Sequence, residues 1–196
     1  MSDGDPRRAF ESAGAFLTGH FVYTSGRHGA DYLEKFRILE DPRATVQLAA
    51  MIADRFRPAR PGLVAGPTTG GIILAYEVAR QLEIKAVYAE PGKDGGRVLR
   101  RGFEIDPGAR VLIVDDVVTT GASLSEMVSC IRETGGQVVG IGVLADRTGG
   151  HAATQVPFFA CLTLDFPSYA PESCPLCAAG VPLAAPRGSG RKTAPV

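Results

Sequence analysis

The sequence has no excess of charge of either sign, no long apolar run and few cysteines. Its 21 Lys and Arg residues balance its 21 Asp and Glu residues, so the positive surface of proteins that bind nucleic acid or acidic membranes is not expected. No apolar run approaches the roughly 20 residues that span a membrane. The N-terminus is polar and acidic and does not resemble a signal peptide. We therefore expect a cytoplasmic protein that binds neither nucleic acid nor membrane.

The four cysteines are too few for a disulfide framework in a chain of this length. Cys130 and Cys161 lie in apolar segments, where a buried free thiol is expected. Cys174 and Cys177 have the spacing of half a zinc site, but structural zinc takes four protein ligands and no second pair lies nearby in the sequence. We expect a tail motif without bound metal, with zinc held between two subunits as the alternative.

What the chain does contain is an alternation of short apolar runs and helical patterns. Near-continuous apolar strands that are bounded by glycine turns and followed by helices are typical of a parallel sheet covered on both faces. The first helix should begin with Asp41 as its N-cap and Pro42 as its first residue. The predicted class is α/β with an open, mostly parallel, doubly wound sheet. The predicted helices are 45–56, 72–82 and 124–132, and the predicted strands are 63–65, 84–88, 111–114 and 138–144.

Two segments do not fit this alternation. Residues 21–37 are typical of short strands around a Ser25-Gly26 turn and predict a small N-terminal cap, whereas the Gly- and Arg-rich residues 93–101 predict a mobile loop or hairpin. The last ten or so residues have no apolar pattern that could offset the entropy of ordering, so we expect them to be disordered. The predicted divisions are a domain at 1–166, with its cap at about 9–38 and its core at about 41–166, and a tail at 167–196.

The most informative motif follows the strand predicted at 111–114. In open α/β sheets ligands bind beyond the carboxyl ends of the strands, where Asp115 and Asp116 arrive side by side. Either carboxylate, if buried without partners, would cost on the order of several kcal/mol. Residues 119–123 then offer three hydroxyls, a glycine and the free N–H groups of the next helix, which together form a phosphate cradle. Carboxylates for sugar hydroxyls followed by a phosphate cradle predict a ribose 5-phosphate ligand.

Other interpretations explain less of this loop. A Walker loop needs a Gly-Lys-Ser/Thr ending and a dinucleotide-binding loop needs three spaced glycines, and neither is present. Response regulators carry an acidic pair in their first strand, whereas more than a hundred residues precede it here. A solvated acidic turn with a purely structural role leaves the hydroxyl-rich half unexplained.

The uninterrupted string from Val111 to Ser123 resembles the ribose-phosphate signature of type I phosphoribosyltransferases. Three further segments resemble the orotate phosphoribosyltransferases at corresponding spacings, and the resemblance spans about 9–166. It implies transfer of the 5-phosphoribosyl group from 5-phosphoribosyl-1-diphosphate to orotate, which gives orotidine 5-phosphate and diphosphate in pyrimidine biosynthesis. The three segments are 21–27 with Tyr32, 66–71, and 145–147.

The resemblance also implies residue roles. Asp115 and Asp116 would take the ribose hydroxyls, and Lys93 would neutralise the departing diphosphate, so these three are the catalytic candidates. Magnesium would be carried by the substrate, bridging diphosphate and ribose, without a direct ligand from the protein. The implied diphosphate-sugar site is Asp115, Asp116, Val117, Val118, Thr119, Thr120, Gly121, Ala122, Ser123, Thr68, Thr69, Gly70 and Lys93.

The implied orotate-binding residues are Thr119, Arg147 and Thr24. An arginine fork suits a planar carboxylate such as the acid group of orotate, although an exposed ion-pair residue is the alternative for Arg147. The cap, through Tyr23 and Tyr32, would cover the base, with ordinary core packing as the alternative for either tyrosine.

Residues 93–101 occupy the position of the family's mobile loop, which usually reaches the neighbouring subunit, so a homodimer is implied. The loop departs from the family pattern, since it keeps one lysine and lacks the histidine, and arginines such as Arg97 would supply further charge or only form a solvated basic loop. The departure leaves two other functions open: a phosphoribosyltransferase for another nucleobase, and a non-enzymatic sensor of the ribose diphosphate.

Overall fold

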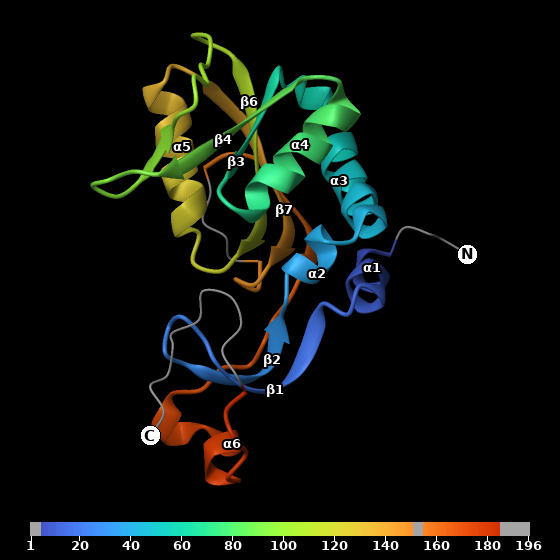
Figure 1. Ribbon diagram of the computed structural model, residues 1–196, viewed down its shortest axis with the longest axis vertical. Coiled ribbons are helices and arrows are strands. Elements are labelled where there is room, and N and C mark those ends of the chain that lie inside the picture. The colour runs from blue at the N-terminus through green and yellow to red at the C-terminus, as the bar shows by residue number, and fades with distance from the viewer. Residues whose placement is uncertain (1–4, 151–154, 185–196) are drawn as a thin grey trace.

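A computed structural model describes residues 5–150 and 155–184 of the chain. Two layers of helices enclose a central sheet, and a smaller region formed by the N-terminal hairpin and the C-terminal segment lies beyond one end of that sheet (Figure 1). The disorder expected for the last ten or so residues lies outside the described residues. No helix within the described ranges is long and apolar enough to cross a membrane.

The central sheet has six strands in the order β5-β4-β3-β6-β7-β8. All neighbouring strands run parallel except β4 and β5, which form an antiparallel hairpin at one edge. This arrangement confirms the predicted open, mostly parallel α/β sheet, and the four predicted strands are found as β3, β4, β6 and β7. The last strand, β8, was not predicted. The bounds are β3 Leu63–Pro67, β4 Lys85–Pro91, β5 Arg97–Leu99, β6 Arg110–Val118, β7 Gln137–Asp146 and β8 Phe158–Thr163.

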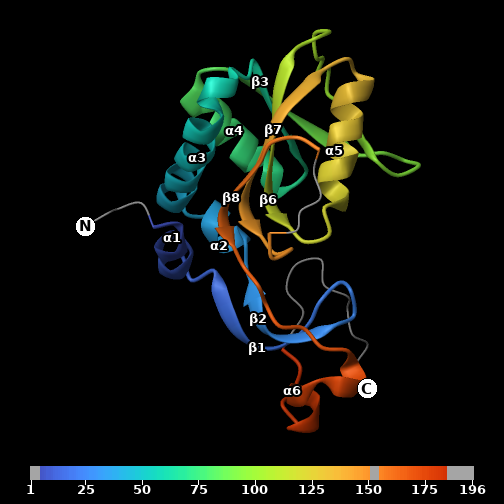
Figure 2. The ribbon, with the colours of Figure 1, turned by 180° about the vertical axis from the view of Figure 1, so that it is seen from behind.

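Helices cover both faces of the sheet, with α3 and α4 on one face and α5 on the other (Figures 1 and 2). Asp41 caps α3 as predicted, because its carboxylate accepts the backbone N–H of Arg43 at 2.9 Å, and Pro42 is the first helical residue. A short 3-10 turn, η1, follows α3. The bounds are α3 Pro42–Phe56, η1 Arg57–Ala59, α4 Gly70–Leu82 and α5 Ala122–Glu133.

The central strand β6 divides the core into two parts. Leu112 and Val114 belong to the cluster that packs under α3 and α4, whereas Val111 and Ile113 belong to the cluster that packs under α5. All four are fully buried, because successive residues of a strand point to opposite faces and both faces are covered. The same alternation sets the directions of the polar residues that follow.

The N-terminal cap is a β-hairpin flanked by two short helices. β1 and β2 pair antiparallel around the turn at residues 23–27, as predicted, and the hairpin lies beyond the carboxyl ends of the parallel strands (Figure 1). The sequence therefore places its cap over the edge of the sheet where ligands bind in this fold class. The bounds are α1 Pro6–Ser12, β1 Phe16–Val22, β2 His28–Leu33 and α2 Phe36–Leu39.

The C-terminal segment packs against this hairpin. Tyr169 forms a β-bridge with His28, in which both backbone N–H groups donate at 2.8–2.9 Å, and the N–H of Ala184 donates to the carbonyl of His20 at 2.8 Å. Both ribbon views place α6 beside β1 and β2 (Figures 1 and 2). The described part of the tail is thus joined to the cap. Its two short helical elements are η2 Pro171–Ser173 and α6 Pro175–Ala178.

Candidate functional site

Asp115 and Asp116 lie inside β6, not in the loop after it. The sequence placed the end of this strand at Val114, but the strand continues to Val118 because its pairing with β7 extends that far. Both carboxylates are buried, with 7% and 2% of the residue exposed. Strand alternation directs Asp115 toward α5 and Asp116 toward α4 and the cap, so each meets a different set of partners.

The partner of Asp116 is Lys35, which follows the second strand of the cap. The Lys35 ammonium lies 2.9 Å from Oδ1 and 2.8 Å from Oδ2 of Asp116, and the backbone N–H of Val117 also donates to Oδ1, at 2.6 Å. On the other side, a Cβ atom on Gly70 would lie 1.9 Å from Oδ2, so glycine is required there for the turn to approach the carboxylate. Lys35 was not predicted, since a lone lysine 81 residues from Asp116 produces no motif.

Asp115 faces residues 119–123, the turn that the sequence predicted to bind phosphate. Its Oδ1 accepts the backbone N–H of Asp116 at 2.8 Å and its Oδ2 accepts the Ser123 hydroxyl at 3.2 Å. Burial of the carboxyl group, followed by the negative charge of Asp116, raises the pKa of Asp115 to about 7, while the backbone hydrogen bond, Lys35 and Ser123 oppose the rise. A buried carboxyl group that titrates near neutrality is typical of a functional site.

Residues 119–121 connect β6 to α5, where the sequence predicted a phosphate cradle. Thr119 and Thr120 are exposed, and Gly121 adopts the left-handed conformation, with a φ of 81°, which a residue with a side chain would disfavour. The N-terminus of α5 has no side-chain cap. The backbone N–H of Ala122 donates to the Thr120 hydroxyl at 3.4 Å, and the N-terminus of α5 would stabilise an anion placed beside it.

A second glycine-rich turn, residues 66–71, joins β3 to α4 beside the first. A Cβ atom on Gly66 would lie 2.2 Å from the carbonyl oxygen of Gly71, and the peptide between Thr68 and Thr69 is cis. Arg97 of β5 donates to the Thr68 hydroxyl at 3.4 Å. One arginine of the basic segment thus contacts the turn that was predicted to bind diphosphate.

The remaining basic residues of this segment lie in or beside the β4–β5 hairpin, one of the two forms that the sequence predicted. Lys93 is exposed in the turn between the strands. Arg97 also pairs with Glu126 of α5 at 3.1 Å, whereas Arg100 and Arg101 lie 4.0 and 2.9 Å from the carboxylate of Glu90. Lys93 therefore lies on the same hairpin as Arg97.

Arg147 lies at the end of β7, next to the turn at residues 119–123. Val118 pairs with Asp146 in the sheet, and the N–H of Arg147 donates to the carbonyl of Val118 at 2.9 Å, so Arg147 and Thr119 leave adjacent strands together. The guanidinium carbon lies 4.8 Å from the ring centre of Tyr23 and 5.1 Å from that of Phe166. Such cation–π contacts orient the arginine between the cap and the C-terminal segment.

The cap contributes Tyr23 and Thr24 to this end of the site. Tyr23 is buried and donates its hydroxyl to the carbonyl of Asp31 at 2.5 Å. Burial raises the pKa of Tyr23, and the charge of Arg147 opposes the rise. Thr24 is exposed in the hairpin turn directly after it. The structure therefore brings the cap turn and the strand ends of β6 and β7 to one region.

The sequence and the fold are both similar to those of known proteins. The phosphoribosyl transferase domain model matches residues 37–170. Orotate phosphoribosyltransferases of Caldanaerobacter subterraneus and Pelotomaculum thermopropionicum are 44% and 45% identical over 177 residues, which cover 90% of this chain and 93% of each relative. The crystal structure of orotate phosphoribosyltransferase from Aeropyrum pernix is 30% identical, with a TM-score of 0.66, over 80% of this chain and 92% of that one.

Proposed function

The chain belongs to the phosphoribosyltransferase family, and on this premise we propose that it transfers the 5-phosphoribosyl group from 5-phosphoribosyl-1-diphosphate to orotate. The products are orotidine 5-phosphate and diphosphate, and the reaction is a step of pyrimidine biosynthesis. The observation that carries the proposal is the similarity, over nine tenths of the chain, to relatives named orotate phosphoribosyltransferase. The similarity does not favour the two alternatives left open by the sequence, another nucleobase or a non-enzymatic sensor.

In this reaction the acidic pair binds the ribose. The diphosphate leaves while the ribose carbon becomes electron-poor, and the deprotonated ring nitrogen of orotate attacks from the other face, so no nucleophile from the enzyme is needed. Asp115 and Asp116 keep free lone pairs beside their present donors and accept the ribose hydroxyls. Their negative charge also stabilises the electron-poor ribose. The 5-phosphate binds at residues 119–123.

Magnesium fits this site as an ion carried by the substrate. The oxygens of Asp116 are held by Lys35, and those of Asp115 by Ser123 and a backbone N–H, so these residues serve better as acceptors for hydroxyls than as direct metal ligands. When bound, the ion offsets charge on the leaving diphosphate. Residues 68–70, Arg97 and Lys93 contribute hydrogen bonds and positive charge at the same end.

Orotate is held between Arg147, Thr119 and Thr24 in this proposal. The guanidinium presents two parallel donors to the carboxylate of orotate, and its contacts with Tyr23 and Phe166 limit its rotation before the base binds. Part of the positioning is therefore present before orotate arrives, which lowers the entropy lost on binding.

The subunit arrangement and location are also proposals. Lys93 is exposed in the turn of a hairpin at the edge of the sheet, which suits a loop, residues 93–101, that reaches the site of the second subunit in a homodimer. A cytoplasmic location and the domain boundary at residue 166 stay predictions of the sequence.

Diphosphate release tests the proposed activity. Purified protein with magnesium and 5-phosphoribosyl-1-diphosphate is offered orotate, uracil, adenine, guanine and xanthine separately. Of these five bases, we expect only orotate to support diphosphate release. Release on a different base would identify another phosphoribosyltransferase, and binding of the ribose diphosphate without release on any base would favour the sensor.

A further inference from the structure

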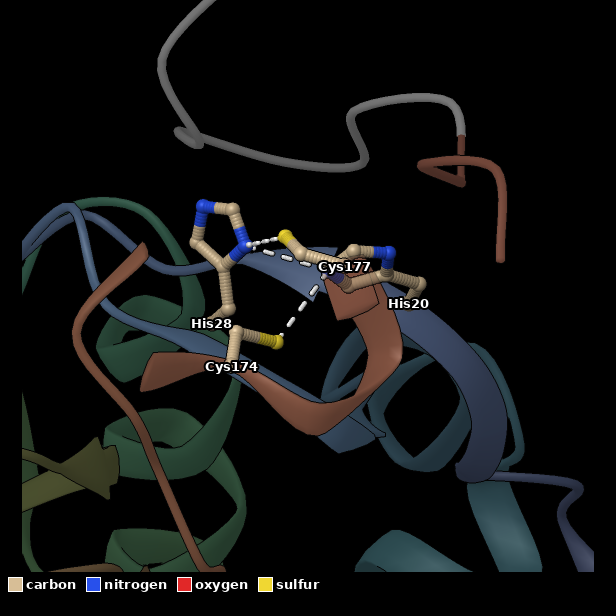
Figure 3. Close-up of side chains that lie close together, drawn as sticks. All are labelled: His20, His28, Cys174 and Cys177. Atoms are coloured by element: carbon tan, nitrogen blue, oxygen red, sulfur yellow. Dashed lines mark hydrogen bonds between the residues drawn. The ribbon is translucent and has the colours of Figure 1, made fainter. Parts of the chain in front are cut away.

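Two histidine and two cysteine side chains, both types that can ligate metals, meet where the C-terminal segment contacts the cap (Figure 3). His20 of β1 and His28 of β2 lie beside Cys174 and Cys177 of the α6 region, and the four ligand atoms all lie within 4.8 Å of one another. The expectation that the cysteine pair lacks a second pair of ligands is wrong. The second pair comes from the hairpin, 154 residues from Cys174 in the case of His20.

The distances between these atoms approach those of a tetrahedral metal site. His20 Nε2 lies 3.0 Å from His28 Nδ1, and Cys174 Sγ and Cys177 Sγ each lie 3.6 Å from His20 Nε2. Cys177 Sγ lies 3.3 Å from His28 Nδ1. Zinc bonds of about 2.0 Å to nitrogen and about 2.3 Å to sulfur give tetrahedral edges of roughly 3.3 Å between nitrogens and roughly 3.6 Å between nitrogen and sulfur. These four distances differ from the tetrahedral edges by a few tenths of an ångström, and the two remaining pairs of ligand atoms lie within 4.8 Å, so closure around an ion needs a movement of up to about 1 Å.

The hydrogen bond on the far side of His20 explains why a cation suits the centre. His20 Nδ1 lies 2.7 Å from the carbonyl oxygen of Val181, and because a carbonyl can only accept, Nδ1 carries the proton and Nε2 presents its lone pair. That lone pair faces His28 and both cysteines at once. One cation would take up all four ligand atoms together, and a hydrogen bond from the outer ring nitrogen to a carbonyl is the usual support of a metal-bound histidine.

We propose that His20, His28, Cys174 and Cys177 bind one zinc ion in a structural site within a single chain. Two imidazoles and two thiolates in a tetrahedron are typical of zinc. Four protein ligands close the coordination shell and leave no position for a substrate, so the site stabilises structure and does not perform chemistry. The ligands come from one chain, which removes the need for a zinc ion shared across a dimer.

The ion would hold the C-terminal segment to the hairpin whose turn carries Tyr23 and Thr24. His20 and His28 flank that turn, and Arg27 within it donates to the Ser168 hydroxyl at 2.9 Å, so the turn is fixed from both sides. Since Tyr23 packs on Arg147, loss of the ion should loosen the end of the site that binds the base. This consequence, unlike the zinc site itself, rests on the proposed function.

Metal content tests the site directly. The full chain, purified from cells supplied with zinc, is expected to hold about one zinc per chain. After removal of the metal, one equivalent of cobalt(II) should produce the visible absorption of tetrahedral cobalt together with thiolate charge transfer. Chelation should lower the melting temperature, and added zinc should restore it. Protein that holds no zinc and takes up no cobalt, or that carries a Cys174–Cys177 disulfide by mass, would overturn the proposal.

Matched cysteine variants distinguish loss of the zinc ligands from the general effect of removing a thiol. The double variant Cys174→Ser/Cys177→Ser should lose its zinc. The control variant Cys161→Ser should keep its zinc, because the Cys161 thiol lies in the core, where it donates a hydrogen bond to the Leu48 carbonyl. If the double variant does not fold, cobalt uptake by the chelated wild-type chain still decides the question. Zinc retained in the double variant would contradict the ligand assignment.

The effect on the base is measured separately. The double variant should raise KM for orotate about tenfold with little change in KM for the ribose diphosphate. If zinc is bound and lost as expected but no base is turned over, the proposed function fails and the metal site stands. Equal KM values for orotate in the zinc-bound and zinc-free enzymes would overturn the link between the ion and the base.

Discussion

The acidic pair in β6 and the His/Cys cluster on the cap are both compact groups of polar residues, buried except for Cys177, but they arise differently. Asp115 and Asp116 are neighbours in the chain and draw much of their environment from residues 117–123. The cluster joins residues up to 157 positions apart at the junction of the cap and the tail. A contiguous motif can be read before the fold is known, whereas an assembled one exists only in the folded chain. If the two groups act separately, the acidic pair should affect turnover and the His/Cys cluster should affect the structure of the cap, and four predictions test this.

The largest effect is expected from the acidic pair. The variant Asp115→Asn/Asp116→Asn should lower kcat/KM for orotate transfer by about a thousandfold, because the charge that stabilises the ribose in the transition state is removed. Diphosphate release measures the loss, and zinc content, which should not change, is the control. Normal turnover in this variant would contradict the role of the pair, and loss of zinc would show that the two groups are not separate.

Arg147 lies between the two regions and should show a smaller effect. Arg147→Ala should raise KM for orotate about a hundredfold and leave binding of the ribose diphosphate unchanged, since only the base loses its paired donors. Arg147→Lys, which keeps the charge without the fork, should recover part of the affinity. An equal loss of affinity for both substrates would instead indicate a general structural role of Arg147.

Lys35 connects the cap to the acidic pair through charge. Its ammonium opposes the rise in the pKa of Asp115, so Lys35→Met should raise that pKa further. The acid limb of the kcat/KM profile against pH should then move up by about one pH unit, with a loss of about fivefold at pH 7. Lys35→Arg is the control that keeps the charge. An unchanged pH profile in Lys35→Met would show that the charge of Lys35 does not influence the pKa of Asp115.

The smallest effect concerns stability and pH. Because the folded-state pKa of Asp115 is raised to about 7 while the unfolded value is near 4, the folded chain retains a proton that the unfolded chain releases between these pH values. Stability from this group therefore falls as pH rises through that window, and the loss is complete above it. Asp115→Asn should remove the loss, so its melting temperature should exceed that of the wild type by more at pH 8 than at pH 4. Calorimetry measures the melting temperatures of both proteins. The same difference between them at pH 4 and pH 8 would contradict a raised pKa of Asp115.

The order of elements and much of the site motif could be predicted because they depend on local patterns. The N-cap at Asp41, the hairpin turn near Gly26 and the sheet strands follow from neighbouring residues. The end of β6 was misplaced at Val114, because a polar pair suggests a loop unless a neighbouring strand satisfies its backbone. The strand β8 was missed, although its residues supply the edge of the sheet.

The sequence by itself determined the α/β class, the family and the succession of carboxylates and phosphate turn, since periodicity and contiguous motifs express the physics of strands, helices and turns directly. Only the tertiary structure decided that Lys35 neutralises Asp116, that Arg147 is held between two rings, and that two histidines of the cap meet two cysteines of the tail. These contacts join distant positions, and the chain brings them together only when burial of the core offsets the entropy of closing such long loops.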